Sequence, residues 1–183
     1  MEVPSANDRA LPADLGWSVV PDLAGTLLLV DRTGTVAGWL IAATSAPATA
    51  RFPLPNGWTG TLALPDGRST TVSNGNSTGI RLVHRTARVR LDSNEWTYQH
   101  LTGAAALIWR DGIELAELHR RRAVRSGRMQ PGQPLPVTYR LARCGQLYPI
   151  DELMITLFGL VFGPPGRAGG LSTVADAVGQ AGL

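Results

Sequence analysis

One segment near the C-terminal end restricts the possible folds of this chain more than any other. Residues 153–163 read LMITLFGLVFG and carry no charge over 11 positions. A helix that crosses a bilayer needs roughly 20 apolar residues, and two prolines follow this segment directly. A half-buried strand would alternate polar and apolar residues, which this segment does not. Because Asp151 and Glu152 suit the positive end of a helix dipole, we expect a helix at 151–162.

The expected helix is apolar on every face, and such a helix is buried on all sides. In a domain of this size the remaining chain has to surround it. The predicted core positions on the helix are Leu153, Met154, Leu157, Phe158, Val161 and Phe162.

Most of the remaining chain consists of short apolar runs separated by turn residues. Aspartate followed directly by glycine occurs twice between such runs, at Asp66-Gly67 and Asp111-Gly112, and this pair is typical of tight β-turns. The chain also contains 21 glycines and 13 prolines, which favours many turns. Strands are expected near 26–30, 35–41, 51–52, 59–72 (a hairpin), 80–91, 95–101, 105–109, 113–118 and 135–144, with a loop at 124–134.

A run of about nine to twelve strands followed by one apolar helix predicts a mainly β fold. A sheet that closes into a barrel has no exposed edges, and a barrel of that size is hollow unless something fills it. We therefore expect a closed antiparallel β-barrel with the buried hydrophobic helix 151–162 inside it.

The 183 residues are predicted to form one domain. Residues 1–14 are expected to be a flexible N-terminal tail, and residues 15–163 the barrel domain. Residues 164–183 are expected to be a Gly/Pro linker and a short C-terminal tail, with a short helix from Ser172. The N-terminus shows no basic segment followed by an apolar one, so no secretory signal is predicted. We expect a cytoplasmic protein, with the membrane periphery as a second location.

All 17 basic residues are arginine, and the formal net charge is +3. Anion recognition through the bidentate guanidinium is one explanation for the absence of lysine, but we favour codon bias, which also explains the abundant Ala, Gly and Pro. A net charge this small does not predict nucleic-acid binding. The most basic segment contains five arginines: Arg120, Arg121, Arg122, Arg125 and Arg128. Clustered guanidinium groups hold phosphates or anionic lipid head groups, and a solvated strand end with its loop is the alternative interpretation.

Other residues with chemical potential do not form a recognisable site. Ser77 lies in GNSTG, which matches the nucleophile pattern G-x-S-x-G, but the strand before it and the helix after it are not predicted. Cys144 is the single cysteine, which excludes a disulfide within the chain, and we interpret it as a small core residue. Three histidines are far apart in the sequence: His84, His100 and His119. No metal site or cofactor is therefore expected.

Two further groups of residues are interpreted as structural. Arg85, Arg88 and Arg90 form a second basic set, in which Arg88 and Arg90 share one face if the segment is a strand, and we interpret the set as solvent-facing. Most of the five tryptophans are expected to pack in the barrel wall, although they would also suit a pocket for an apolar ligand. Trp58, in LPNGWTG, is the tryptophan expected to be exposed.

Several of these segments, in this order, resemble the tubby-like superfamily, in particular its scramblase-like and LURP-one-related branch. VDRTG at 30–34 is similar to the first strand and turn of that fold. ARFPL at 50–54, followed by LALPDG at 62–67, is similar to its second hairpin. LIWRDGIELAELHR at 107–120 resembles a later hairpin, and YPIDELMITLFGLVFG at 148–163 resembles the closing hydrophobic helix.

The resemblance implies a twelve-stranded barrel around the helix. It also implies binding of membrane lipid head groups, mostly phosphoinositides, or a role in lipid scrambling. Two features of the family are missing from this chain. It has no lysine-rich head-group motif, and no Asp-x-Asp calcium loop precedes Asp151, so calcium dependence is not implied.

Three functions remain open at this point. The first is a non-enzymatic module that binds anionic lipid head groups through the arginines of 120–128. The second is a barrel that binds a small molecule, as a carrier or a cyclase in specialised metabolism, and it requires an internal cavity. The third is a structural or regulatory domain that binds a protein partner through the tail at 171–183.

Overall fold

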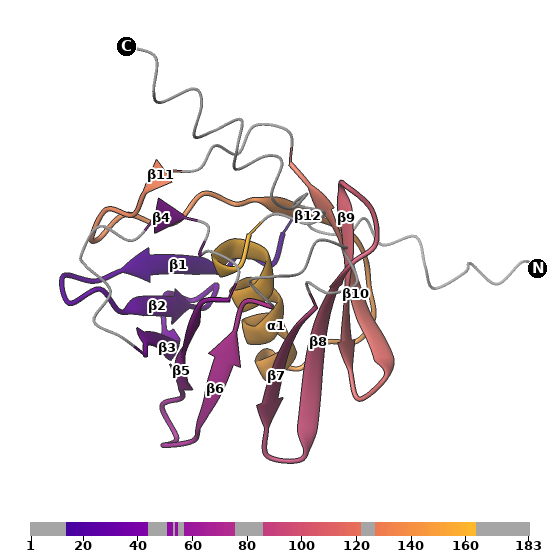
Figure 1. The fold of residues 1–183 in the computed structure, drawn as a ribbon, viewed down its shortest axis with the longest axis horizontal. Helices are drawn as coiled ribbons and strands as arrows, with labels where there is room; N and C mark the ends of the chain where they lie inside the picture. Colours follow the sequence, from indigo (N-terminus) through magenta and orange to yellow (C-terminus); the bar gives the residue numbers. More distant parts are fainter. Residues whose placement is uncertain are drawn as a thin grey trace, which may run out of the picture.

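The computed structural model describes residues 14–43, 51–52, 54, 57–75, 86–121 and 127–163 (Figure 1). Within these ranges the chain forms one ten-stranded antiparallel sheet, one two-stranded sheet and one C-terminal helical segment. The predicted mainly β class with a C-terminal helix is therefore confirmed.

The strands of the large sheet follow one another in chain order, and β4 and β11 pair separately. Two strands were not predicted from the sequence: β1, and β11, which lies within the loop expected at 124–134. β11 is a strand because it pairs with β4, which lies far away in the sequence. The strands are β1 (Ser18–Pro21), β2 (Leu27–Val30), β3 (Val36–Ala42), β4 (Arg51–Phe52), β5 (Thr59–Ala63), β6 (Ser69–Ser73), β7 (Ala87–Leu91), β8 (Asn94–His100), β9 (Ala105–Arg110), β10 (Ile113–Arg120), β11 (Gly127–Arg128) and β12 (Tyr139–Cys144).

The hairpin of β9 and β10 shows why the Asp-Gly pairs form turns. Asp111 and Gly112 both have positive φ, 51° and 79° respectively. A two-residue type I′ turn requires this backbone at both central positions, and glycine and aspartate tolerate it better than most residues. The carboxylate of Asp111 also accepts the backbone N–H of Glu95 at 2.8 Å, which connects this turn to the start of β8.

The large sheet is not closed by strand pairing. Its order begins with β1 and ends with β12, and these two strands are not paired with each other in the described residues. Residues 132–135 lie along β1 instead: the N–H of Leu135 donates to Val19 O at 2.7 Å, and that of Gly132 donates to Pro21 O at 2.8 Å. Prolines at 131, 134 and 136 have no N–H to donate, so this segment cannot form a continuous ladder. The expected closure of the barrel therefore fails at one seam, between β1 and β12.

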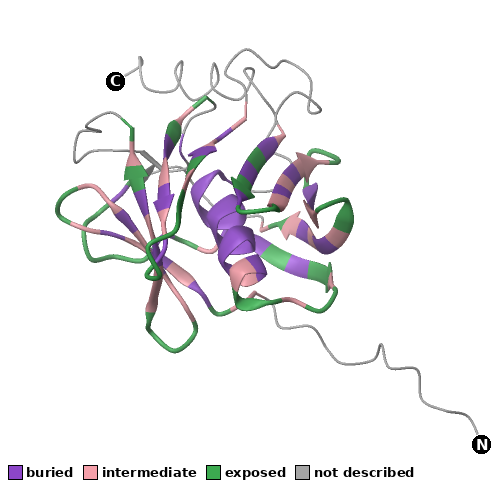
Figure 2. Ribbon diagram, turned by 90° about the horizontal axis from the view of Figure 1, so that it is seen from below, coloured by how far each residue is buried: buried purple, intermediate pink, exposed green. Residues whose placement is uncertain are grey.

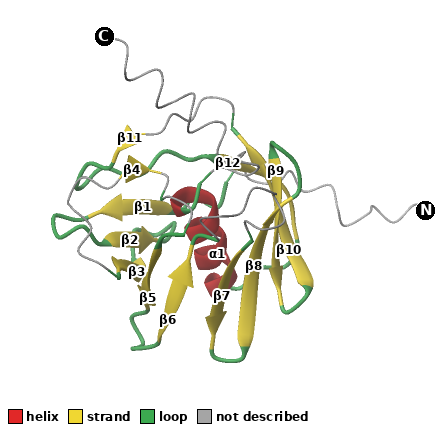
Figure 3. Ribbon diagram, viewed as in Figure 1, coloured by secondary structure: helices red, strands yellow, loops and turns green. Residues whose placement is uncertain are grey.

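The helix lies in the middle of the curved sheet, with strands around it (Figure 3). It consists of α1 (Pro149–Thr156) and a π-helical turn, η2 (Leu157–Val161), that continues it directly. It begins two residues before the predicted start, because Pro149 occupies the first turn, where a missing N–H costs nothing. Asp151 then takes the third helical position and accepts the N–H of Tyr148, the N-cap residue, at 3.0 Å.

All six core positions expected on the helix are buried, with exposed fractions between 0% and 4%. Figure 2 shows this as a helix that is purple on every side, except near its beginning. The inward side chains of the strands complete the core, and they include Trp96 and Tyr98 of β8 at 1% exposure. The ring of Tyr98 stacks on Phe158 with a centroid distance of 5.4 Å. The space inside the sheet is therefore occupied by the helix itself.

The carbonyl groups at the end of the helix accept hydrogen bonds from distant parts of the chain. The N–H of Leu54 donates to Val161 O at 3.1 Å, and the amide of Asn74 donates to Phe162 O at 3.4 Å. Tyr98 donates its hydroxyl hydrogen to Gly163 O at 3.2 Å. Carbonyl groups at the end of a helix lack partners within the helix, so these contacts replace water there.

Trp58 is half-buried, and not exposed as predicted. Its ring lies 6.3 Å from that of Phe162, and it covers Gly60, where a Cβ atom would be 2.3 Å from the indole. The predicted tails fall mostly outside the described residues, which begin at Asp14 and end at Gly163. The short helix expected from Ser172 also lies outside them.

Replacing Gly159 with alanine should destabilise the protein. A Cβ atom there would lie 2.5 Å from two ring carbons of Tyr139, which is 1% exposed and cannot move aside. Overpacking of this kind costs about 1–3 kcal/mol, against a gain of up to about 1 kcal/mol in helix propensity. Urea unfolding should therefore give a lower midpoint for Gly159→Ala.

Gly103→Ala is the matched control. Gly103 is exposed, and a Cβ atom there would meet nothing within 4 Å. Its unfolding free energy should stay within about 0.5 kcal/mol of the parent. Equal midpoints for both variants would show that the helix and β12 do not pack as closely as described.

Candidate functional site

The first turn of the helix carries two adjacent carboxylates that bind opposite parts of the sheet. Asp151 is fully buried, and its Oδ1 accepts the indole N–H of Trp96 at 2.9 Å. Its Oδ2 accepts a guanidinium N–H of Arg110 at 2.6 Å. The same guanidinium lies 5.1 Å from the ring centroid of Tyr148, at a cation–π distance. Asp151 therefore connects the helix to β8 and β9.

Glu152 makes the corresponding contacts on the other side. Its Oε2 accepts the indole N–H of Trp17 at 2.9 Å, and its Oε1 pairs with the guanidinium of Arg32. Trp17 precedes β1, and Arg32 lies in the turn between β2 and β3. The glutamate side chain is 14% exposed and that of Arg32 is 61% exposed. Glu152 is thus a fixed group, whereas its arginine partner is largely in solvent.

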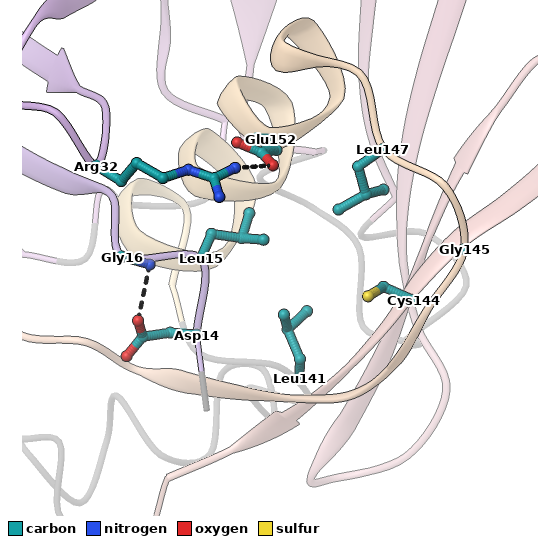
Figure 4. A pocket seen from close by; sticks show the side chains of 9 residues that line it. All are labelled: Asp14, Leu15, Gly16, Arg32, Leu141, Cys144, Gly145, Leu147 and Glu152. Atoms are coloured by element: carbon teal, nitrogen blue, oxygen red, sulfur yellow. Dashed lines mark hydrogen bonds and ion pairs between the residues drawn. The ribbon is translucent and has the colours of Figure 1, made fainter. Parts of the chain in front are cut away.

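A cleft of about 560 Å³ opens at the seam, beside Glu152 (Figure 4). Its apolar lining consists of Leu15, Leu141, Leu147 and the thiol of Cys144, and their side chains point into the open space. The cleft lies between β12 and the segment that leads into β1. Ligand pockets in proteins commonly have volumes of about 300–1,000 Å³, so this cleft has the size of a small-molecule site.

The charged groups of the cleft are Asp14, Arg32 and Glu152. Asp14 accepts the N–H of Gly16 at 2.9 Å, and its other oxygen lies 3.3 Å from Arg121. Burial raises the pKa of the Cys144 thiol, and the negative charge of Glu152 raises it further. A raised pKa keeps the thiol protonated, so Cys144 is not prepared to act as a nucleophile.

The structure fixes both ends of the predicted basic segment. Arg120 ends β10, and its N–H donates to Ala104 O at 2.8 Å, while the N–H of Arg121 donates to Thr138 O at 2.9 Å. At the other end Arg128 belongs to β11, where its backbone is in register with Arg51 of β4. This small sheet lies near the end of the helix (Figure 1). Arg122 and Arg125 lie outside the described residues.

The described arginines divide into two groups by their partners. Six of them pair with carboxylates of described residues: Arg32, Arg68, Arg90, Arg110, Arg121 and Arg143. Arg120 and Arg128, in contrast, are exposed and form no ion pair within the described part of the chain. Arg88 and Arg140 share this property, on β7 and β12 respectively. Two of the three described members of the basic segment are therefore available to an external anion.

The remaining candidates do not come together. Ser77 and His84 lie outside the described residues, as does the arginine at 85. His100 packs edge-on against Tyr98 with a centroid distance of 4.8 Å, and His119 contacts Glu117 at 2.8 Å. Across the ranges that the structure describes, no three His, Cys, Asp or Glu side chains are arranged to hold a metal ion. No helix in those ranges is both long enough and apolar enough to cross a membrane.

Sequence reasoning did not find the cleft or the partners of Asp151 and Glu152. Trp96 and Asp151 are 55 positions apart, and Arg32 and Glu152 are 120 apart. Asp151 and Glu152 themselves were the signal in the sequence that could have pointed to these contacts. Carboxylates at the start of a buried helix need hydrogen-bond donors from other parts of the chain.

Comparisons of the chain with protein-family models, curated proteins and solved structures found no match. The relation to the tubby-like superfamily therefore stays a prediction from the sequence.

We expect the thiol of Cys144 to titrate at a higher pH in the folded protein than in the chain unfolded in urea. Burial and the charge of Glu152 both disfavour the thiolate. The pH dependence of alkylation by iodoacetamide, followed by intact mass, measures this. Because the folded-state pKa is the higher one, the protein should also lose stability as the pH rises past the ordinary thiol pKa.

Glu152→Gln should lower the pH at which alkylation of Cys144 is half-maximal in the folded protein, because the variant removes the negative charge. The glutamine oxygen still provides an acceptor for the indole N–H of Trp17. If the pH midpoint of alkylation in the folded parent were equal to or lower than that of the unfolded chain, the thiol could not lie in buried, negatively charged surroundings.

Proposed function

We propose that this protein is a non-enzymatic module that binds anionic phosphate head groups of membrane lipids through the segment 120–128. The observation that supports the proposal is the state of Arg120 and Arg128. Both are exposed and lack an ion pair in the described residues, while the backbone at each end is hydrogen-bonded into a sheet. An anchored backbone lowers the entropy lost when the guanidinium groups bind a phosphate.

The paired arginines contribute much less to such binding. A guanidinium that already holds a carboxylate, as in Arg143 with Glu114 and Glu117, would have to lose that partner first. A free arginine near an anionic membrane contributes about 1 kcal/mol, and it binds phosphate oxygens with two parallel hydrogen bonds. The proposal therefore assigns binding to a location and not to the net charge of +3.

The proposed relation to the tubby-like, scramblase-like group is consistent with the strands that surround a helix buried on all sides. If the chain has the tubby-like fold, the segment 132–135 takes the place of the strand that closes the barrel. The burial of the helix inside the sheet favours this proposal over the alternative of a ligand held in the same space.

Flotation with vesicles tests the proposal. The full chain should bind vesicles of phosphatidylcholine with a phosphatidylinositol phosphate, should not bind phosphatidylcholine alone, and should be released by high salt. The double variant Arg120→Ala/Arg128→Ala should bind roughly 10- to 30-fold more weakly, since each arginine contributes about 1 kcal/mol.

The matched control is Arg88→Ala, which removes from β7 an exposed arginine that forms no ion pair with any described residue, and it should change binding less than about twofold. A free inositol polyphosphate distinguishes head-group recognition, which it would inhibit, from attraction to a charged bilayer. Equal loss in the control and the double variant would refute a local site. Salt-resistant binding to both kinds of vesicle would mean that the apolar helix inserts, and no binding to either would leave a protein partner as the alternative.

A further inference from the structure

The cleft at the seam has properties that the arginine segment does not explain. Three leucines and a protonated thiol line it together with Arg32 and two carboxylates, Asp14 and Glu152 (Figure 4). Leu15 and Leu147 are half-buried and Leu141 is buried, so the apolar lining of the cleft is continuous with the core beside it. A few polar groups that converge on an apolar cleft are the usual signature of a ligand site.

The two members of the ion pair in the cleft are not equivalent. Glu152 is 14% exposed and belongs to the helix, and its second oxygen, Oε2, accepts the indole N–H of Trp17 at 2.9 Å. Arg32 is 61% exposed and lies in a turn. Exposed ion pairs contribute about 0–1 kcal/mol, so Arg32 can leave the carboxylate at a small cost. A second cation can therefore replace Arg32 on Glu152.

The charge of Glu152 determines whether the cleft favours a cationic or an anionic ligand. Asp14 is already paired with Arg121 at 3.3 Å, so Glu152 is the carboxylate of the cleft that a displaced Arg32 leaves without its ion pair. The field of Glu152 also reaches the opposite wall despite its arginine partner, because it contributes to the raised pKa of Cys144. The negative charge of Glu152 would repel an anionic ligand and attract a cationic one.

We propose that the cleft binds a small amine with an apolar body, whose ammonium group replaces the guanidinium of Arg32 at Glu152. The apolar body then lies on Leu15, Leu141 and Leu147, and it covers the thiol of Cys144. This site is separate from the proposed anion-binding segment and does not depend on it.

Cys144 provides a direct readout, because it is the only cysteine in the chain and its side chain lines the cleft. The probes are n-hexylamine, hexanoate and 1-hexanol, which share one chain length and differ in charge. The rate at which methyl methanethiosulfonate modifies Cys144 is followed by intact mass at fixed pH. Hexylamine should slow the reaction in a saturable manner, hexanol should slow it less, and hexanoate should have the smallest effect.

Arg32→Ala gives the most specific outcome. It removes the competitor for Glu152 and should tighten hexylamine binding by about two- to fivefold, the range expected for an exposed ion pair. Arg90→Ala is the matched control, because Arg90 is also exposed and paired, with Glu95 at 2.6 Å, and it should change nothing. In Glu152→Gln the amine should lose its advantage over hexanol, with thermal unfolding as the check that the variant is folded.

Three results would overturn the proposal. Hexanoate could protect Cys144 as well as hexylamine does, Arg32→Ala could weaken the binding of the amine, or none of the three compounds could protect the thiol. The lipid-binding proposal is tested by flotation, so the failure of one proposal leaves the other unaffected.

Discussion

The carboxylate of Asp151 has no contact with solvent, and donors from three parts of the chain satisfy it. They are the indole of Trp96, the guanidinium of Arg110 and the backbone N–H of Tyr148. Leaving a buried charge without its partner costs about 3–5 kcal/mol, which is comparable to the stability of a small domain. The helix can therefore start at only one place in the sheet. Its apolar side chains favour burial in general, and this carboxylate determines the register.

The position of the seam follows from the same part of the molecule. Glu152 binds Trp17, just before β1, and Arg32, in the turn after β2. The helix start is thereby held near the β1 end of the sheet, while the chain enters the helix shortly after β12. The prolines of 131–136 prevent a regular ladder there, and two backbone hydrogen bonds to β1 replace it. An open seam beside a charged helix start leaves a cleft with apolar walls and a carboxylate at one side. A barrel closed by a full ladder would bury these groups.

Local chemistry predicts much of this fold, and non-local contacts account for what was missed. The Asp-Gly pairs predict the hairpins because the backbone they need is a property of two residues. The helix is predicted because a segment apolar on all faces has few other solutions. The cleft depends on groups such as Leu15 and Leu147, which lie far apart in the sequence and meet only through the register of the sheet. The arginines of 120–128 could be proposed as a cluster, but whether each one pairs with a carboxylate within the described residues depends on the fold.

One ion pair connects the two proposed sites. Asp14 lines the cleft, and its partner Arg121 belongs to the basic segment, with 3.3 Å between their charged atoms. Their side chains are 29% and 40% exposed, so solvent weakens the interaction to about 1 kcal/mol or less. A ligand that draws either residue away from the other changes the affinity of the second site by at most about fivefold, and the effect must be reciprocal. The two sites should therefore behave as nearly independent sites, with coupling that is small and lost in high salt.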